Sequence, residues 1–228
     1  MGKTFHPDGH CVYTGFWWRL ALPAVTLSAH LAVSVLASAA AVRFLGGSGA
    51  TLAIGLPAGF VAWTLFEYVL HRWLLHDTRH PVRRKVFWEK FHREHHLYRK
   101  MEDPDPHTVH PAITLPISIA LLAAVGLATR SALALIVTTG WLVGYSAYEG
   151  LHWVFHSAIL SRATAPIAWV RRLRAAHTIH HLERANRNYG FLTLFWDRVF
   201  GTFDPVGARQ SVKTNSISCS PGGSRTAR

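Results

Sequence analysis

Four long hydrophobic runs, each with almost no charged residue, dominate the pattern of the chain. They cover roughly residues 20–45, 50–70, 112–129 and 131–151. At 1.5 Å per residue, a helix of this length crosses a hydrocarbon core of about 30 Å. Packing the runs as core helices of a soluble protein would need amphipathic helices to cover them, and the chain has too few. The pattern predicts an all-α integral membrane protein with four transmembrane helices.

Short connections group these helices into two hairpins. Gly46-Gly47-Ser48-Gly49 joins the first two runs, and Thr129-Arg130-Ser131 joins the last two. Each hairpin therefore leaves the membrane on the side where it entered. Residues 71–111 and 152–203 are expected to form a helical cap on that side, within a single domain that spans residues 1–203. Residues 204–228 are rich in Ser, Gly and Arg and are expected to form a disordered tail.

The charge distribution places this cap in the cytoplasm. The chain has 24 Lys and Arg against 12 Asp and Glu, a net charge of +12. Nine basic residues lie within 72–100 and six within 162–187, whereas the opposite side holds only Arg43 and Arg130. By the positive-inside rule, the termini and the cap are cytoplasmic. A basic chain also suits nucleic-acid binding, but the hydrophobic runs favour a membrane, and no nucleic-acid partner is expected.

Histidine is the residue type that points to chemistry. Ten of the 16 histidines fall into four groups at or just past the cap-side ends of the hydrophobic runs. The second and fourth runs each lead into a histidine pair, and each cap segment then holds an H-x2-H-H motif. In chain order, the candidate metal ligands are His71, His76, His92, His95, His96, His152, His156, His177, His180 and His181.

Helical spacing allows these side chains to converge. Residues three and four apart share a helix face, so each H-x2-H-H motif is expected to direct its histidines at one centre. His71 and His76 are five apart, about 140° around an α-helix, and must approach the site from two sides or follow a local distortion. Glu67 and Glu149 lie one turn before the two pairs and are candidates to orient the first histidine of each.

Ten imidazoles match two metal ions better than one, because a single ion takes about four to six ligands. Neutral imidazole suits Zn, Cu, Fe and Ni, and a donor set poor in carboxylates does not suit Mg or Ca. The H-E-x-x-H motif of zinc proteases is absent. Two redox-active irons that activate O2 are the economical explanation. A haem protein or a metal transporter is the non-enzymatic alternative, but either would need ligands inside the spans.

The four histidine groups, in this order, resemble those of the fatty acid hydroxylase superfamily. These membrane di-iron enzymes include fatty acid 2-hydroxylases, sterol desaturases and sterol C4-methyl oxidases, with bacterial carotenoid hydroxylases as relatives. The resemblance covers roughly residues 60–203 and includes Asn188-Tyr189-Gly190 followed by W-D-x-x-F-G-T from Trp196. It adds Asn188 and Asp197 to the candidates beside the metal ligands.

The resemblance implies O2-dependent hydroxylation of a C–H bond in a membrane lipid, whether a fatty acyl, sterol-like or carotenoid chain. The same site supports desaturation, and no residue decides between the two reactions. The implied cofactors are two Fe ions, for which Zn can substitute in purified protein. About twenty residues precede the first run, and no dinucleotide-binding glycine motif is present. Electrons are therefore expected from a separate redox protein, either cytochrome b5-like or a ferredoxin with its reductase.

Overall fold

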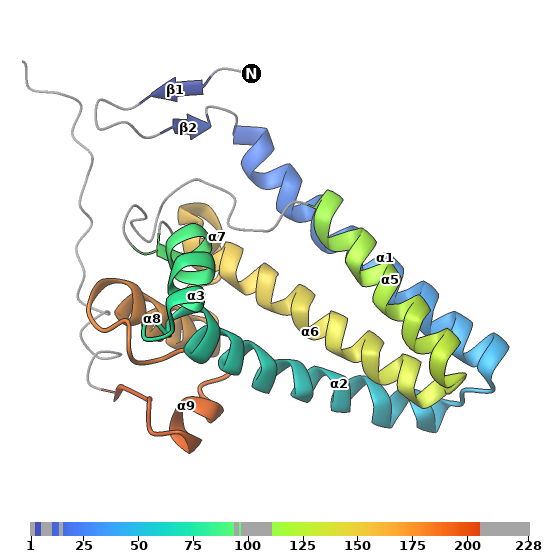
Figure 1. The fold of residues 1–228 in the computed structure, drawn as a ribbon. Helices are drawn as coiled ribbons and strands as arrows, with labels where there is room; N and C mark the ends of the chain where they lie inside the picture. The colour runs from blue at the N-terminus through green and yellow to red at the C-terminus, as the bar shows by residue number, and fades with distance from the viewer. Residues whose placement is uncertain (1–2, 6–10, 14–15, 94–95, 97–110, 206–228) are drawn as a thin grey trace, which may run out of the picture.

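Four long helices form the body of the molecule, and shorter elements gather at one end of it (Figure 1). The computed structural model describes the backbone of residues 3–5, 11–13, 16–93, 96 and 111–205, and the side chains of 21–89, 92, 93, 96 and 112–205. Each predicted hydrophobic run is helical. The long helices are α1 (Phe16–Leu45), α2 (Gly49–Val69), α5 (Pro111–Thr129) and α6 (Ala132–His156).

The shorter elements form what we call the cap, together with the segment 183–205. They are the π-helix η1 (Leu70–Leu75), α3 (Pro81–Arg83), the π-helix η2 (Arg84–His92), α7 (Ala158–Ala163), α8 (Ala168–Leu182) and α9 (Phe195–Val199). Two short antiparallel strands, β1 (Lys3–Phe5) and β2 (Cys11–Tyr13), precede α1 and were not part of the all-α prediction. The predicted tail from residue 206 onward lies outside the described residues.

Two tight turns join the long helices, as predicted. Gly46 has a φ of +70°, and Ser48 caps α2 through reciprocal hydrogen bonds with the amide and hydroxyl of Thr51. Arg130, with a φ of +49°, turns the chain between α5 and α6. Both turns lie at the end of the bundle away from the cap (Figure 1). As a result, α2 and α6 run in the same direction and deliver their last turns to the cap.

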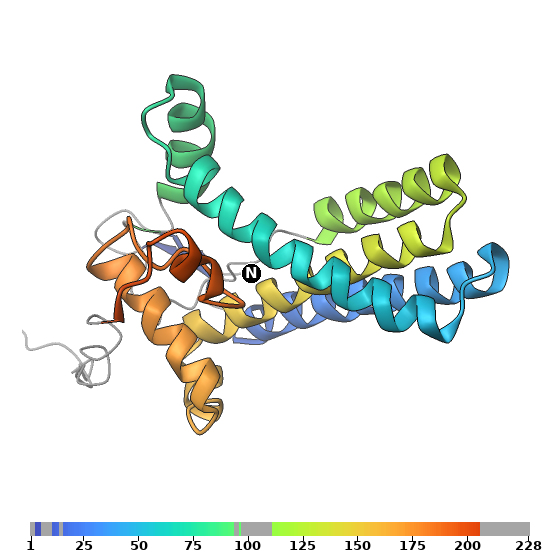
Figure 2. The ribbon, with the colours of Figure 1, turned by 90° about the horizontal axis from the view of Figure 1, so that it is seen from below.

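The central helix of the bundle is α6. It packs against α2 on one side and against α1 and α5 on the other (Figure 2). Gly59 of α2 and Gly140 of α6 each lie against the backbone of the facing helix, where a Cβ would overlap it. Nearer the cap, Gly144 leaves room for the Trp63 side chain. These glycines permit a close crossing of α2 and α6, the two helices that lead into the predicted histidine pairs.

Three helical segments, Ala21–Leu45, Gly49–Leu75 and Ala112–Thr129, are long and apolar enough to cross a membrane. Their outer surfaces hold large apolar side chains that are more than half exposed, including Val35, Leu36, Phe44, Ile54, Val61, Ile117 and Leu127. A water-soluble surface rarely carries so large an apolar area. The fourth predicted span, α6, is helical and packs against α1, α2 and α5, but it is not among these three segments. The count of four spans stays a prediction.

Replacing Gly59 with Ala is expected to lower the melting temperature of the detergent-solubilised protein by roughly 2–10 °C. The added methyl group would overlap the Val137 carbonyl and push α2 away from α6. Gly49→Ala is the matched control, because no heavy atom lies within 4 Å of a Cβ at Gly49. Equal melting temperatures for the two variants would contradict the close crossing.

Candidate metal centre

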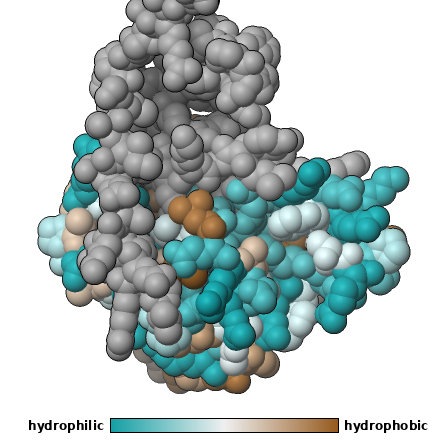
Figure 3. Space-filling view, turned by 90° about the vertical axis from the view of Figure 1, so that its left-hand side faces the viewer, coloured by the Kyte–Doolittle hydropathy of each residue, from teal (hydrophilic) through white to brown (hydrophobic). Residues whose placement is uncertain are grey.

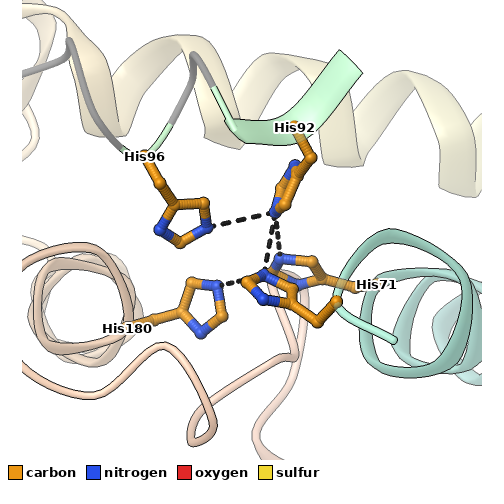
Figure 4. A group of neighbouring side chains, drawn as sticks. His71, His92, His96 and His180 are labelled. Carbon is orange, nitrogen blue, oxygen red and sulfur yellow. Dashed lines mark hydrogen bonds between the residues drawn. The ribbon is translucent and has the colours of Figure 1, made fainter. Parts of the chain in front are cut away.

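Eight of the ten predicted ligands fall into two groups at the cap end of α2 and α6. The five-histidine group consists of His71, His76, His92, His96 and His180, and the three-histidine group of His152, His156 and His177. Within each group, the candidate ligand atoms all lie within 4.8 Å of one another. Figure 4 shows the labelled rings of the five-histidine group turned toward a common centre.

The rings of the five-histidine group meet through their Nε2 atoms. Nε2 of His92 lies 3.1 Å from that of His71, 2.9 Å from that of His76 and 3.1 Å from that of His96. Nε2 of His180 lies 3.0 Å from that of His76. A proton on His92 Nε2 can point at only one of its three neighbours. Nitrogen lone pairs are therefore left facing one another.

Two of these rings have a tautomer fixed by the backbone. A carbonyl oxygen only accepts hydrogen bonds, so Nδ1 of His71 donates to the Tyr189 carbonyl at 2.6 Å. In the same way, Nδ1 of His180 donates to the Arg187 carbonyl at 2.7 Å. In the neutral ring, Nε2 then carries a lone pair that points into the group. Such donation from the outer nitrogen is typical of metal-bound histidine.

The nitrogen separations fit a shared metal ion. Nitrogen ligands at about 2.1 Å from one ion and at right angles to each other lie about 3.0 Å apart. The observed separations of 2.9, 3.0 and 3.1 Å agree with that geometry. A cation at the centre would also remove the repulsion between the lone pairs. The residues present therefore fit a metal site.

Burial keeps the imidazoles neutral. It lowers the pKa of His96 to about 4. Burial, followed by the proximity of the other imidazoles, also lowers the pKa of His76, His92 and His180 well below the usual range. The pKa of His177 is lowered for the same reasons. Neutral imidazole is the form that binds a metal, so these side chains are available as ligands at pH 7.

A π-helical turn brings His71 and His76 onto one face. In η1 the backbone amide of His76 donates to the His71 carbonyl at 3.2 Å, an i→i+5 hydrogen bond. This pattern places residues five apart above one another. The two ring centroids lie 4.9 Å apart. The five-residue spacing allowed either an approach from two sides or a local distortion of the helix, and the structure has the local distortion.

The three-histidine group joins α6 to α8. The ring centroids of His152 and His156 lie 4.8 Å apart, and Nε2 of His177 lies 3.0 Å from that of His156. His181 lies between the two groups, with its ring centroid 4.4 Å from that of His96 and 4.3 Å from that of His177. The two candidate centres are therefore neighbours.

The prediction that each H-x2-H-H motif serves one centre is wrong for the second motif. His177 belongs to the three-histidine group and His180 to the five-histidine group. Positions three apart on a helix differ by about 60° in direction and about 4.5 Å along the axis. Because α8 lies between the groups, it presents the two side chains to different centres. In the first motif, His92 and His96 do share a group, and His95 lies outside the described residues.

The spacing predicted that Glu67 orients His71, but the hydrogen bonds of Glu67 go to other groups. Its Oε1 accepts hydrogen bonds from the backbone amides of Phe191 at 3.1 Å and Leu192 at 2.9 Å. Its Oε2 accepts from the Trp63 indole at 3.2 Å. Glu67 therefore acts on the segment 187–192, here called the clamp loop, whose carbonyls orient two of the histidines.

Further hydrogen bonds hold the clamp loop, from Asp197 and from Asn188, which belongs to the loop itself. Asp197 accepts from the amides of Tyr189 at 2.8 Å and Gly190 at 2.9 Å. Burial raises the pKa of Asp197, and hydrogen bonds from Thr202 and these two amides oppose the rise. Asn188, with a φ of +53°, accepts from the backbone amide of residue 204 at 2.9 Å. Both side chains thus support the loop and not a histidine ring.

Glu149 is buried one turn before His152 and is 3 % exposed. Its Oε2 has no hydrogen-bond partner in the described part of the chain. Its predicted role as the residue that orients His152 stays a prediction.

A family model of fatty acid hydroxylases matches residues 56–202, which is more than half of the chain. The chain belongs to the fatty acid hydroxylase family. The match contains all ten predicted ligands and the whole clamp loop.

Several eukaryotic proteins of the fatty acid hydroxylase family are similar to the chain. A dihydroceramide fatty acyl 2-hydroxylase of Arabidopsis thaliana is 28% identical over 162 residues, which cover 68% of this chain and 63% of the plant protein. A ceramide very long chain fatty acid hydroxylase of Saccharomyces cerevisiae is 31% identical over 157 residues, covering 64% and 36% respectively. The fatty acid 2-hydroxylase of Rattus norvegicus is 28% identical over 153 residues, covering 66% and 39%. The match spans less than two thirds of each relative.

The fold also matches a solved structure, described as full-length scs7p with only the hydroxylase domain visible. The TM-score is 0.64 at 24% sequence identity, and the match covers 86% of this chain and 73% of that chain. The likeness shows that the helical bundle with its cap is a fold shared with a hydroxylase domain.

Sequence reasoning missed Phe191, which contacts both histidine groups. Its ring centroid lies 5.2 Å from that of His71, 5.0 Å from that of His152 and 4.6 Å from that of His177. An apolar ring therefore lies against both groups and offers no hydrogen bond to water there. The available signal was its position directly after Asn188-Tyr189-Gly190. The two carbonyls that fix the tautomers are backbone groups, so the residue types at these positions could not have predicted their role.

Glu67→Ala is expected to lower the melting temperature and to speed the loss of bound metal to a chelator. The substitution leaves two buried amides without an acceptor, at about 1–3 kcal/mol each, and frees the clamp loop. Glu89→Ala is the control, because the Glu89 side chain is 44% exposed and pairs with Arg84 at the surface. Equal chelation rates for the two variants would show that Glu67 does not support the metal site.

Proposed function

We propose that this chain is an O2-dependent di-iron hydroxylase that acts on a C–H bond in the acyl chain of a membrane lipid. The observation that carries the proposal is the convergence of neutral imidazole nitrogens in two adjacent groups. Neutral imidazole binds iron among other transition metals, so the histidines of both groups would be able to hold iron. The relatives' names, all of them lipid hydroxylases, support the substrate class and favour hydroxylation over desaturation.

Hydroxylation places one oxygen atom of O2 into the C–H bond, and two electrons and two protons convert the other oxygen atom to water. Iron held by the histidines would supply the reduction of O2 and the removal of hydrogen from carbon. The protein's own part is to orient the histidine ligands and to exclude water. The carbonyls of Arg187 and Tyr189 keep two Nε2 atoms available as ligands, and Phe191 keeps the space between the groups dry.

His177→Ala and His180→Ala are each expected to lower formation of the hydroxylated lipid at least 100-fold, as measured by mass spectrometry. Each removes one ligand from a different group, so neither centre alone should sustain the reaction. His80→Ala serves as the control, because His80 is exposed and belongs to neither histidine group. Full activity in either ligand variant, with both metals still bound, would contradict the di-iron proposal.

The cap is proposed to face the cytoplasm, with both termini on the same side. The basic residues of 72–100 and 162–187 support this orientation. Lys and Arg are enriched on the cytoplasmic side of membrane proteins, where the lipid surface is anionic. The end of the molecule that carries the cap presents mostly hydrophilic residues (Figure 3).

Reporter domains fused within residues 46–49 or 129–131 are expected on the outer side of the membrane. A reporter placed after residue 205 is expected in the cytoplasm. The physical reason is that each hairpin returns to the side of the membrane where it entered, and the excess of Lys and Arg places that side in the cytoplasm. Activity of compartment-specific reporters checks the result, and a cytoplasmic signal from either turn would contradict the arrangement.

A separate redox protein is proposed to dock over a polar cleft in the cap. The cleft has a volume of about 490 Å³ and reaches His76 of the five-histidine group. Arg72, Arg79 and Arg187 also line it. A basic cleft beside a buried metal site suits an acidic electron carrier of the cytochrome b5 or ferredoxin type, because charge complementarity speeds its association.

Arg79→Glu is expected to slow turnover that depends on an acidic redox protein several-fold, with a larger effect at low salt. The Arg79 side chain is 87% exposed, so loss of its surface ion pair with Asp77 at 3.1 Å should change the stability of the fold little. Arg172→Glu, an exposed charge on α8 outside the cleft, is the control. Single turnover after chemical reduction should be unchanged in both variants. An equal loss in the control would remove the cleft as the docking site.

A further inference from the structure

A carboxylate lies behind the His71 ring, one peptide group away from it. The Tyr189 carbonyl, which accepts the hydrogen bond from Nδ1 of His71 at 2.6 Å, belongs to the peptide group between Tyr189 and Gly190. The amide of that same peptide group, on Gly190, donates to Oδ2 of Asp197 at 2.9 Å. Two hydrogen bonds joined by one peptide group therefore connect Asp197 to His71. We call this connection the relay.

The relay needs a residue without a side chain at position 190. A Cβ atom on Gly190 would lie 2.9 Å from Oδ2 of Asp197 and would overlap the Thr193 carbonyl. Gly190 is buried, and Asp197 and His71 are only 0% and 2% exposed. Hydrogen bonds are electrostatically stronger in such an environment than in water. The relay is therefore a close and shielded contact.

Three further side chains lead from the relay to the polar cleft of the cap. Oγ1 of Thr202 donates to Oδ1 of Asp197 at 2.7 Å, so its single proton is used and it accepts from the Tyr68 hydroxyl at 2.9 Å. The Tyr68 hydroxyl in turn accepts from Nη1 of Arg72 at 2.8 Å. Arg72 lines the cleft. Every proton in this chain thus points toward Asp197, as a carboxylate ion requires.

The same contacts favour the ionised form of Asp197. Burial raises the pKa of Asp197, and the hydrogen bond from Thr202 is the largest opposing influence. The amides of Gly190 and Tyr189 and the guanidinium of Arg72 also lower this pKa. Together they support a negative charge that burial alone would disfavour.

A peptide group can transmit the effect of such a charge. A carboxylate at its amide makes its carbonyl oxygen more negative, because hydrogen bonds in series polarise one another. A more negative Tyr189 carbonyl strengthens the hydrogen bond from Nδ1 of His71, and Nε2 then becomes a stronger electron donor.

We propose that Asp197 acts through this peptide group as a positioning residue that strengthens His71 as a metal ligand. A stronger donor favours the more oxidised state of a bound iron, so Asp197 also keeps the reduction potential of that iron low. The proposal rests on the proposed function only in requiring a metal ion at the five-histidine group.

The test loads the full-length protein with zinc in detergent, so that neither iron nor O2 is needed. Zinc affinity is measured by competition with a chelator. The Nδ1–H proton resonance of His71 is followed by NMR of protein with isotope-labelled histidine, and it is assigned by its loss in His71→Gln. Asp197→Asn removes the charge with almost no change in size. It is expected to weaken binding of one zinc ion roughly tenfold, the lower end of what loss of a direct partner of a metal-bound histidine costs, and to move the resonance upfield.

Glu67→Gln is the matched control. Glu67 is also a buried carboxylate that accepts two backbone amides of the clamp loop, but these amides belong to the two peptide groups after the one that His71 contacts. If Asp197 only holds the loop in place, the two substitutions should affect His71 equally. We expect Glu67→Gln to leave the His71 resonance in place.

Thr202→Val and Thr202→Ser keep the test valid if Asp197→Asn fails to fold. Valine removes the hydrogen bond to Oδ1 of Asp197, whereas serine keeps it. We expect Thr202→Val to move the His71 resonance upfield by less than Asp197→Asn does, and Thr202→Ser to restore it.

An unmoved His71 resonance in both Asp197→Asn and Thr202→Val, or an equal shift in Glu67→Gln, would overturn the proposal. If the resonance moves as expected but the iron-loaded protein forms no hydroxylated lipid, the proposed function fails and the relay remains.

Discussion

The repulsion between neutral imidazole lone pairs is the constraint on which the cap depends. Five Nε2 atoms are drawn together in a buried space, and the two tautomers that the backbone fixes, at His71 and His180, leave lone pairs directed inward. Desolvation prevents the rings from resolving the conflict by protonation, because burial holds their pKa values low. A metal ion would turn this repulsion into bonds, and its binding would then contribute to folding of the cap.

The rest of the molecule can be understood as support for that convergence. The close crossing of α2 and α6 at Gly59 and Gly140 brings two histidine-bearing helix ends to the same place. The clamp loop then joins the groups, and the buried carboxylates of Glu67 and Asp197 hold it through hydrogen bonds from its backbone amides. A carboxylate that accepts hydrogen bonds from two backbone amides fixes a loop more firmly than apolar packing does. Displacement of the loop would leave several buried polar groups unpaired.

The sequence was sufficient for the four long helices and for identifying eight of the histidines that meet at their cap end, because both depend on local patterns. Hydrophobic runs of membrane length joined by short turns specify helical hairpins with little dependence on tertiary contacts. The partition of the histidines was not predictable. His177 and His180 are neighbours on one helix, and only the position of α8 between the groups sends them to different centres. The roles of Glu67 and of the Tyr189 carbonyl likewise depend on contacts between residues more than 100 positions apart.

The central claim is that the two histidine groups hold two irons. Elemental analysis of protein purified from iron-replete cells, combined with its optical spectrum, tests this claim most directly. The account predicts two iron atoms per chain and no Soret band, since the ligands are imidazoles at two neighbouring non-haem centres. One metal per chain, no bound iron under iron-replete conditions, or a haem spectrum would contradict it.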